Sequence, residues 1–270
     1  MAEEREIELR SGRTAVRVEG AGRPFVWTHG FTNSMALEDE LGTSALLRDH
    51  AGVQLVRYDA RGHGRSAPGS DDAASAWSRL AIDLLELTDR LGLQRPVAGG
   101  ASMGTATTLH AAVRAPDRFA ALVLVVPPTA WDTRKAQADL YRGSAGLVEA
   151  CGVGAYLEAA RAAYRQRPMP GFDEVAYEKI LQSLGALAPA DLARIMRGAA
   201  ASDLPDPAAL RQIRAPALIV ATRGDPGHPL STGERLAELL PNATLRVVES
   251  LLELGSARGE LGRFLAAAPR

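Results

Sequence analysis

The stretch VAGGASMG, residues 97–104, decides the fold of this chain. It carries the pattern G-x-S-x-G, and it lies between an apolar run and the helical segment GTATTLHAAVRAP (104–116). This context predicts a sharp strand-to-helix turn that exposes the Ser102 hydroxyl above the carboxyl edge of a sheet. The N-terminus of the following helix favours negative charge that develops there. Ser102 is therefore the candidate nucleophile.

A dinucleotide-binding loop is the alternative interpretation of the same glycines. That loop requires G-x-G-x-x-G so that the backbone can approach a pyrophosphate. Ala101 stands where the second of these glycines is needed. We therefore set the nucleotide interpretation aside.

Short apolar runs alternate with helical patterns through most of the chain. This alternation predicts an α/β fold with a mostly parallel, doubly wound sheet. The segment IELRSGRTAVRVEGAG (7–22) instead holds two short alternating runs joined by Ser-Gly-Arg, which predicts an N-terminal antiparallel hairpin at the sheet edge. The other predicted strands lie within residues 22–30, 53–59, 95–100, 119–128, 215–225 and 243–250.

The strand signals stop between residues 131 and 203. This region is helical in pattern and interrupted by CGVG and RPMPG, and LPDP (204–207) follows its end. It is too long for a connection inside a compact domain, so we interpret it as an insertion that lies over the sheet. The predicted organisation is a core of residues 1–130 and 204–270 with a helical cap at 131–203.

The composition of the chain argues against several classes of function and partner. The chain has 270 residues and a formal net charge of −1, which argues against nucleic acid or an anionic membrane as partner. Its one cysteine, Cys151, offers neither an internal disulfide nor a zinc cluster. The charged N-terminus lacks a signal core, and no run of about eighteen apolar residues occurs. We expect a cytoplasmic protein that acts on a small molecule, as a monomer or a homodimer.

Three motifs together carry a family resemblance. They are His29-Gly30-Phe31, the run Asp59-Ala60-Arg61-Gly62-His63-Gly64-Arg65-Ser66, and the Ser102 turn. With them the chain resembles the α/β-hydrolase superfamily, in the branch of capped esterases, lactonases and proline iminopeptidase-like enzymes. The resemblance covers nearly the whole chain and implies hydrolysis without a cofactor or a metal.

The resemblance also implies roles for residues around Ser102. The backbone N–H groups of Phe31 and Met103 would form the oxyanion hole. His63 and His110 would be structural. The residues expected to border an apolar substrate pocket are His29, Gly30, Met35 and Trp131.

The sequence offers an acid at the position that the family uses, but no histidine at the family's position for the base. Asp225 follows the strand predicted at 215–222, where the family places its acid. The family's histidine would then fall in VVESLLELGSARGELGRFL (247–265), which contains none. Leu251 and Leu252 occupy this region and cannot accept a proton, and Glu253 would need burial to act as a base near neutral pH.

His228 is the remaining candidate base. It lies three residues after Asp225, a span of at most about 10 Å. Ser102, His228 and Asp225 then form a possible triad of altered chain order, because triads are recognised by geometry. Two hypotheses stay open. One is a serine hydrolase that cleaves a small ester, lactone or thioester through an acyl-Ser102 intermediate. The other is a non-hydrolytic protein that binds an apolar ligand or catalyses a lyase or isomerase step.

Overall fold

A computed structural model describes residues 2–48, 50–168 and 173–269. Its core is an eight-stranded sheet in the order β1-β2-β4-β3-β5-β6-β7-β8. β2 runs antiparallel to both β1 and β4, and every pair from β4 to β8 is parallel. The predicted α/β fold and the N-terminal antiparallel hairpin are therefore confirmed. The strands are β1 (Ala2–Leu9), β2 (Gly12–Gly20), β3 (Arg23–Thr28), β4 (Val53–Tyr58), β5 (Val97–Ala101), β6 (Ala121–Val125), β7 (Ala217–Thr222) and β8 (Ala243–Val248).

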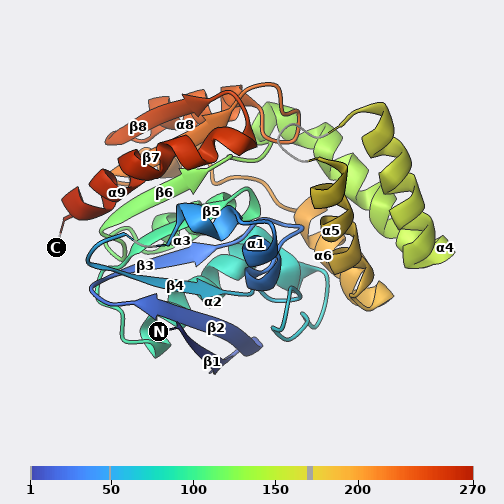
Figure 1. The fold of residues 1–270 in the computed structure, drawn as a ribbon, viewed down its shortest axis with the longest axis horizontal. Coiled ribbons are helices and arrows are strands. Elements are labelled where there is room, and N and C mark those ends of the chain that lie inside the picture. The colour runs from blue at the N-terminus through green and yellow to red at the C-terminus, as the bar shows by residue number, and fades with distance from the viewer. Residues whose placement is uncertain (1, 49, 169–172, 270) are drawn as a thin grey trace.

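Alternating side chains of the central strands supply two cores. Val26, Val56 and Ala98 belong to one apolar cluster. Their neighbours Phe25, Leu55 and Val97 belong to the other. This period of two is what strands covered on both faces require. The helices that supply the first cluster are α2 (Trp77–Arg90), α3 (Met103–Arg114) and α8 (Leu230–Leu239), and α9 (Arg258–Ala267) supplies the second. Figure 1 shows the helices on both sides of the twisted sheet.

The helical segment predicted between the sheet strands lies to one side of the sheet, beyond the carboxyl ends of the parallel strands (Figure 1). Its longest helix bends at Gly152, whose φ of 83° and ψ of 169° break the helical path. The segment comprises α4 (Arg134–Gln166), α5 (Glu174–Gly185) and α6 (Pro189–Ala200). α4 packs against α6, and α5 contacts α1 (Met35–Glu40) of the core. The segment therefore sits over the edge at which Ser102 lies.

Short elements complete the chain. They are α1 (Met35–Glu40), α7 (Pro207–Leu210) and the 3₁₀ turns η1 (Thr43–Leu46), η2 (Ala73–Ser75), η3 (Trp131–Thr133) and η4 (Leu251–Ala257).

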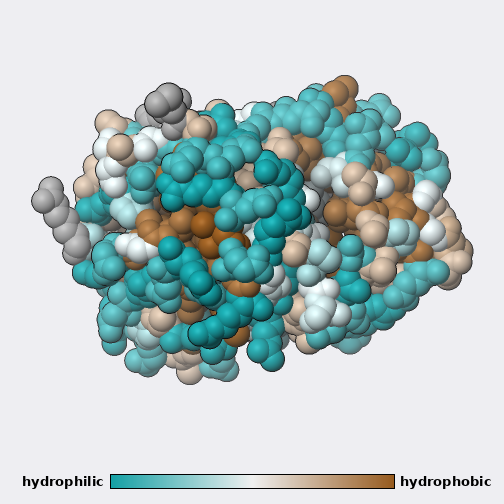
Figure 2. Space-filling model, turned by 90° about the horizontal axis from the view of Figure 1, so that it is seen from below, coloured by the Kyte–Doolittle hydropathy of each residue, from teal (hydrophilic) through white to brown (hydrophobic). Residues whose placement is uncertain are grey.

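Figure 2 shows mostly hydrophilic residues on the face seen from below, with hydrophobic residues gathered over the sheet portion and over the helical portion. Within the described ranges, no helix combines the length and apolar character needed to cross a membrane.

Candidate active site

Ser102 occupies a strained turn between β5 and α3. Its φ of 52° and ψ of −110° lie outside the regions that a serine ordinarily adopts. Such strain costs on the order of 1–3 kcal/mol and persists only where the surroundings impose it. The sequence expectation of a sharp turn at this serine agrees with this backbone geometry.

Gly100 and Gly104 let the helix approach the sheet. A Cβ at Gly100 would lie 2.4 Å from the backbone carbon of Gly104. A Cβ at Gly104 would lie 2.0 Å from the carbonyl oxygen of Thr28, at the end of β3. Both positions require glycine because backbone atoms, which cannot move aside cheaply, fill the space.

We expect Gly104→Ala to destabilise the fold by at least about 3 kcal/mol, because the added methyl group forces α3 away from β3. Urea denaturation followed by circular dichroism measures this change. The matched control is Gly146→Ala in α4, where a Cβ meets nothing within 4 Å. There alanine should stabilise the helix by about 0.5–1 kcal/mol. Equal effects of the two substitutions would contradict the packing argument.

His228 links Ser102 to Asp225. The Nε2 atom of His228 lies 2.8 Å from the Ser102 Oγ atom, and its Nδ1 atom lies 2.8 Å from Asp225 Oδ2. The backbone N–H of Gly227 donates to Asp225 Oδ1 at 2.8 Å. The loop after β7 thus brings an imidazole and a carboxylate to the serine. The structure places together the three side chains that the sequence analysis singled out.

The protonation of this cluster follows from its contacts. Burial alone would raise the pKa of Asp225, but the hydrogen bond and the charge of His228 and the backbone N–H groups lower it below its ordinary value. An ionised Asp225 accepts the Nδ1 proton of His228, so the Nε2 lone pair faces the Ser102 hydroxyl. This tautomer is the one that can take a proton from serine.

The final loop supplies no competing base among its described side chains. Glu253 is exposed in η4, and its Oε2 accepts the backbone N–H of Glu249 at 3.2 Å. The side chains of Leu251 and Leu252, which replace the expected histidine, lie outside the described part of the structure.

Phe31 and Met103 are the residues whose backbone N–H groups were expected to form an oxyanion hole. Met103 is the first residue of α3, so its N–H has no acceptor inside the helix. Gly30 lies against the turn, because a Cβ there would be 3.8 Å from the Ser102 Cβ. His63 Nε2 lies 2.8 Å from the carbonyl oxygen of Phe31 and anchors that loop.

Two buried histidines hold the loops rather than exchange protons. His29 Nε2 accepts the backbone N–H of Ala60 at 2.9 Å. Burial lowers the pKa of both His29 and His63 to about 4, so both rings are neutral at physiological pH. Asp59 completes the scaffold by accepting the N–H groups of Met35 and Arg65 at 2.7 and 2.9 Å. The 59–66 motif is thus structural.

The match to a protein-family model extends over most of the chain. A family model described as the alpha/beta hydrolase fold matches residues 23–250. The chain belongs to the α/β-hydrolase family. This span includes the Ser102 turn, Asp225 and His228, and it ends before most of the final loop.

Several curated relatives of this α/β-hydrolase carry the names of hydrolases, and others carry the name of a non-heme haloperoxidase or chloroperoxidase. A protein of Variovorax paradoxus (strain S110), provisionally named carbamate hydrolase RutD, is 32% identical over 240 residues, which are 83% of this chain and 82% of the relative. The 3-oxoadipate enol-lactonase 2 of Acinetobacter baylyi is 29% identical over 199 residues, covering 73% of this chain and 70% of the relative.

Solved structures support the fold. A hydrolase from Pseudomonas aeruginosa PA01 superposes with a TM-score of 0.79 at 24% identity, over 98% of each chain. The enol-lactonase from Burkholderia xenovorans LB400 gives a TM-score of 0.76 at 19% identity, over 97% of this chain and 98% of that one. At such identities the likeness concerns the fold alone.

A cavity of about 1000 Å³ opens at Ser102 of this α/β-hydrolase. Gly30, Phe31, Ser102, Asp225 and His228 line it. Apolar and aromatic side chains of the α4–α6 segment line the far side, namely Leu140, Tyr141, Tyr156, Tyr177, Ile180, Leu181, Leu184 and Met196. The ring of Tyr141 lies 5.0 Å from that of Phe31, centroid to centroid, so the segment contacts the loop that follows β3.

Three residues expected at the pocket lie outside its wall. His29 is buried and accepts the N–H of Ala60, and Met35 is buried with its N–H bound to Asp59. Trp131 donates its indole N–H to the carbonyl oxygen of Pro205 at 3.2 Å, on the path back from the helical segment. Neither these nor the buried Met103 line the cavity among the described residues. Of the four predicted pocket residues, only Gly30 borders it.

The sequence analysis missed other residues of the wall. Tyr141 and Met196 lie 55 residues apart in the chain, on α4 and α6, and Glu38 lies on the six-residue helix α1. Arg134, at the start of α4, is buried, with its guanidinium 4.2 Å from the Trp77 ring centroid. Its Nε donates to the carbonyl oxygen of Ser202 at 2.7 Å. Arg134 thereby fastens the helical segment to the core.

Proposed function

We propose that this protein is a cofactor-free serine hydrolase that cleaves an apolar carboxylic ester, lactone or thioester through an acyl-Ser102 intermediate. The observation that carries the proposal is the 2.8 Å contact between His228 Nε2 and Ser102 Oγ, with Asp225 2.8 Å from the other ring nitrogen. These distances are those required for proton transfer by a positioned base. The histidine comes from the acid's own loop.

Acylation would follow from this geometry. The Ser102 oxygen attacks the carbonyl carbon while its proton passes to His228 Nε2, and the carbonyl π electrons move to oxygen. The N–H groups of Phe31 and Met103 donate to that oxyanion, and ionised Asp225 stabilises the imidazolium. The bond to the leaving group then breaks, and the leaving group takes the proton from Nε2.

Deacylation would reverse these roles with water. His228 takes a proton from water as the water oxygen attacks the acyl carbon. The second tetrahedral intermediate then collapses, the Ser102 oxygen regains its proton from His228, and the carboxylic acid leaves. Each cycle consumes one water and restores the serine.

The cavity supports an apolar substrate. Most residues that the α4–α6 segment contributes to its wall are apolar or aromatic, with Gln137, Ser144, Arg167 and Asp173 as the polar exceptions, and this composition favours burial of hydrocarbon. We propose that this segment acts as a cap that shields the acyl enzyme. The names of the relatives, carbamate hydrolase and enol-lactonase, both describe hydrolysis at an acyl carbon and support this reaction class.

Labelling with a fluorophosphonate tests the proposal. We expect rapid modification of Ser102, identified by peptide mass spectrometry, because only an activated serine attacks phosphorus readily. Ser102→Ala should abolish the label. Ser70→Ala, at an exposed serine that bonds to Asp71, should leave it intact. A protein that folds but takes no label would instead support the non-hydrolytic hypothesis.

A further inference from the structure

Arg134 is a buried cation at the start of α4. Its residue is 5% exposed, and all of its hydrogen-bond partners among the described residues are neutral oxygens. Burial of a charged group is costly unless an opposite charge accompanies it. A guanidinium that the fold retains with neutral partners alone therefore points to a role beyond stability.

The guanidinium joins the two ends of the α4–α6 segment. Its Nε atom donates to the carbonyl oxygen of Ser202 at 2.7 Å, and its Nη2 atom donates to that of Ala199. Both carbonyl groups lie at the C-terminal end of α6, where the helix dipole favours a cation. The guanidinium also lies over the Trp77 ring of the core helix α2. One side chain thus fastens the beginning and the end of the segment to the core.

The third contact of Arg134 leads to residues 224–228, the loop that carries the acid and the base and is called the catalytic loop below. Its Nη1 atom donates to Thr129 Oγ1 at 3.1 Å. The backbone N–H of Thr129 donates in turn to the carbonyl oxygen of Gly227 at 3.1 Å. Apart from the contact with Ser102, this is the one hydrogen bond among the described residues that reaches the catalytic loop from the rest of the chain.

The position of the catalytic loop matters twice for the reaction. Asp225 and His228 both lie on it, so any displacement of the loop moves the acid and the base together relative to Ser102. A misplacement of about 1 Å between reacting groups can cost on the order of 100-fold in rate. The hydrogen bond from Thr129 therefore bears directly on whether the base reaches the serine.

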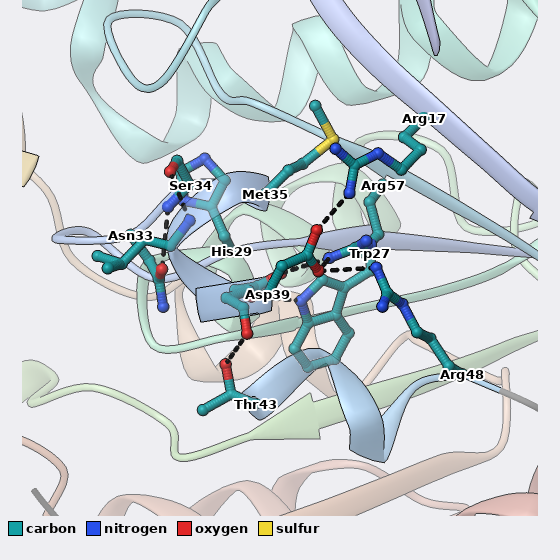
Figure 3. A network of polar contacts seen from close by, with 12 residues as sticks. Arg17, Trp27, His29, Asn33, Ser34, Met35, Asp39, Thr43, Arg48 and Arg57 are labelled. Atoms are coloured by element: carbon teal, nitrogen blue, oxygen red, sulfur yellow. Dashed lines mark hydrogen bonds and ion pairs between the residues drawn. The ribbon is translucent and has the colours of Figure 1, made fainter. Parts of the chain in front are cut away.

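The opposite side of the site is anchored in another way. The helix α1, which follows the loop after β3, carries Asp39, and Figure 3 shows this carboxylate held between Arg17, Arg48 and Arg57. Arg17 and Arg57 belong to the strands β2 and β4. Ion pairs to the sheet therefore hold α1, whereas the catalytic loop depends on a contact that leads to the α4–α6 segment.

We propose that Arg134 is a positioning residue for the reaction. Through Thr129 it holds the catalytic loop, and the loop sets the distance between His228 and Ser102. The inference rests on the proposed function, in which His228 is the base. Because the same guanidinium holds both ends of the α4–α6 segment, alignment of the base is coupled to the seating of that segment on the core. Arg134 itself is not among the residues that line the cavity.

Thr129→Val tests this link, because it removes the acceptor of Arg134 and keeps the backbone N–H that binds Gly227. We expect kcat to fall about tenfold for both p-nitrophenyl acetate and p-nitrophenyl octanoate, with KM unchanged, since alignment is lost and no substrate contact is. Thr129→Ser, which keeps the hydroxyl group, should retain the wild-type kcat. Arg134→Met should cost about 100-fold, and Thr129→Val should add little to that loss because both act on one contact.

Thr88→Val is the matched control. Thr88 is also buried, and its Oγ1 accepts a guanidinium N–H from Arg118 at 2.8 Å. The substitution therefore removes a buried hydrogen bond of the same kind from α2, away from the cavity. We expect Thr88→Val to lower the melting temperature about as much as Thr129→Val does, while it leaves kcat at the wild-type value.

The NMR resonance of the His228 Cε1–H group gives a readout that requires no hydrolysis. Its absence from His228→Ala assigns it, and Ser102→Ala shows how it shifts when the contact with the serine is lost. In Thr129→Val we expect a shift in the same direction as in Ser102→Ala. Thr129→Ser and Thr88→Val should leave the resonance in place.

The outcomes separate this inference from the proposed function. An unshifted His228 resonance in Thr129→Val, or a kcat equal to that of Thr88→Val, overturns the positioning role. A Thr129→Ser variant as slow as Thr129→Val overturns it too, and so does a change confined to KM for the octanoate. If the resonance shifts as expected but the wild-type protein cleaves no ester, the positioning role stands and the hydrolase does not. If Arg134→Met does not fold, the threonine variants still decide the question.

Discussion

His228→Ala should lower kcat for ester hydrolysis by about four to six orders of magnitude, because the residual rate then comes from oxyanion stabilisation and binding alone. The 2.8 Å contact to Ser102 makes this ring the one base in reach among the described side chains of the cavity wall. KM should change little, since the proton moves only in the transition state. Steady-state kinetics with p-nitrophenyl esters measures both constants.

Imidazole rescue and a second histidine control this experiment. Free imidazole should restore part of the rate of His228→Ala by entering the space that the ring leaves. His110→Ala should keep a rate close to wild type, because His110 lies on α3 and bonds to the carbonyl oxygen of Asp203 at 2.9 Å. An unchanged kcat in His228→Ala would remove this residue from the mechanism and reopen the question of the base.

The sheet was predictable because its signals are local. Apolar runs between helical patterns located the central strands, and small residues at 100–104 placed the turn at Ser102. Each such signal depends on neighbours within a few residues. The backbone strain at Ser102 and the parallel strand order then follow from packing a helix so close to the sheet.

The pocket was less predictable because its wall is assembled from distant segments. Met35 and Trp131 were expected to border the substrate pocket. The N–H of Met35 instead bonds to Asp59, and that of Trp131 bonds to Asp203, 72 residues along the chain. Glu38 reaches the cavity only because α1 folds back over Trp27, and a six-residue helix carries too little periodicity to reveal which side is buried.

For His228, the position in the chain was predictable from the sequence, whereas the orientation of its ring was not. Chain spacing limits how far His228 can lie from Asp225, but it does not say where the ring points. The structure turns Nδ1 to Asp225 and Nε2 to Ser102, across 126 residues of chain. That orientation depends on the short loop after β7, where Gly227 and His228 both donate backbone N–H groups to Asp225.

Asp225→Asn should lower kcat by about four orders of magnitude while leaving the fold intact. Asparagine has the same shape and can still accept the Gly227 N–H through Oδ1. Its Nδ2 group then faces His228 Nδ1 and donates to it, which moves the ring proton to Nε2. A protonated Nε2 cannot accept the Ser102 proton, so the ring is held in place with the wrong tautomer.

The low pKa of Asp225 sharpens this expectation. Its pKa lies below the ordinary value, so wild-type Asp225 is ionised throughout the neutral range. The loss in Asp225→Asn should therefore persist across that range rather than appear only in acid. Asp71→Asn, at an exposed aspartate, should retain both kcat and thermal stability. If Asp225→Asn kept most of the wild-type kcat with an unaltered melting temperature, the carboxylate would serve only the loop, and His228 would act without an orienting partner.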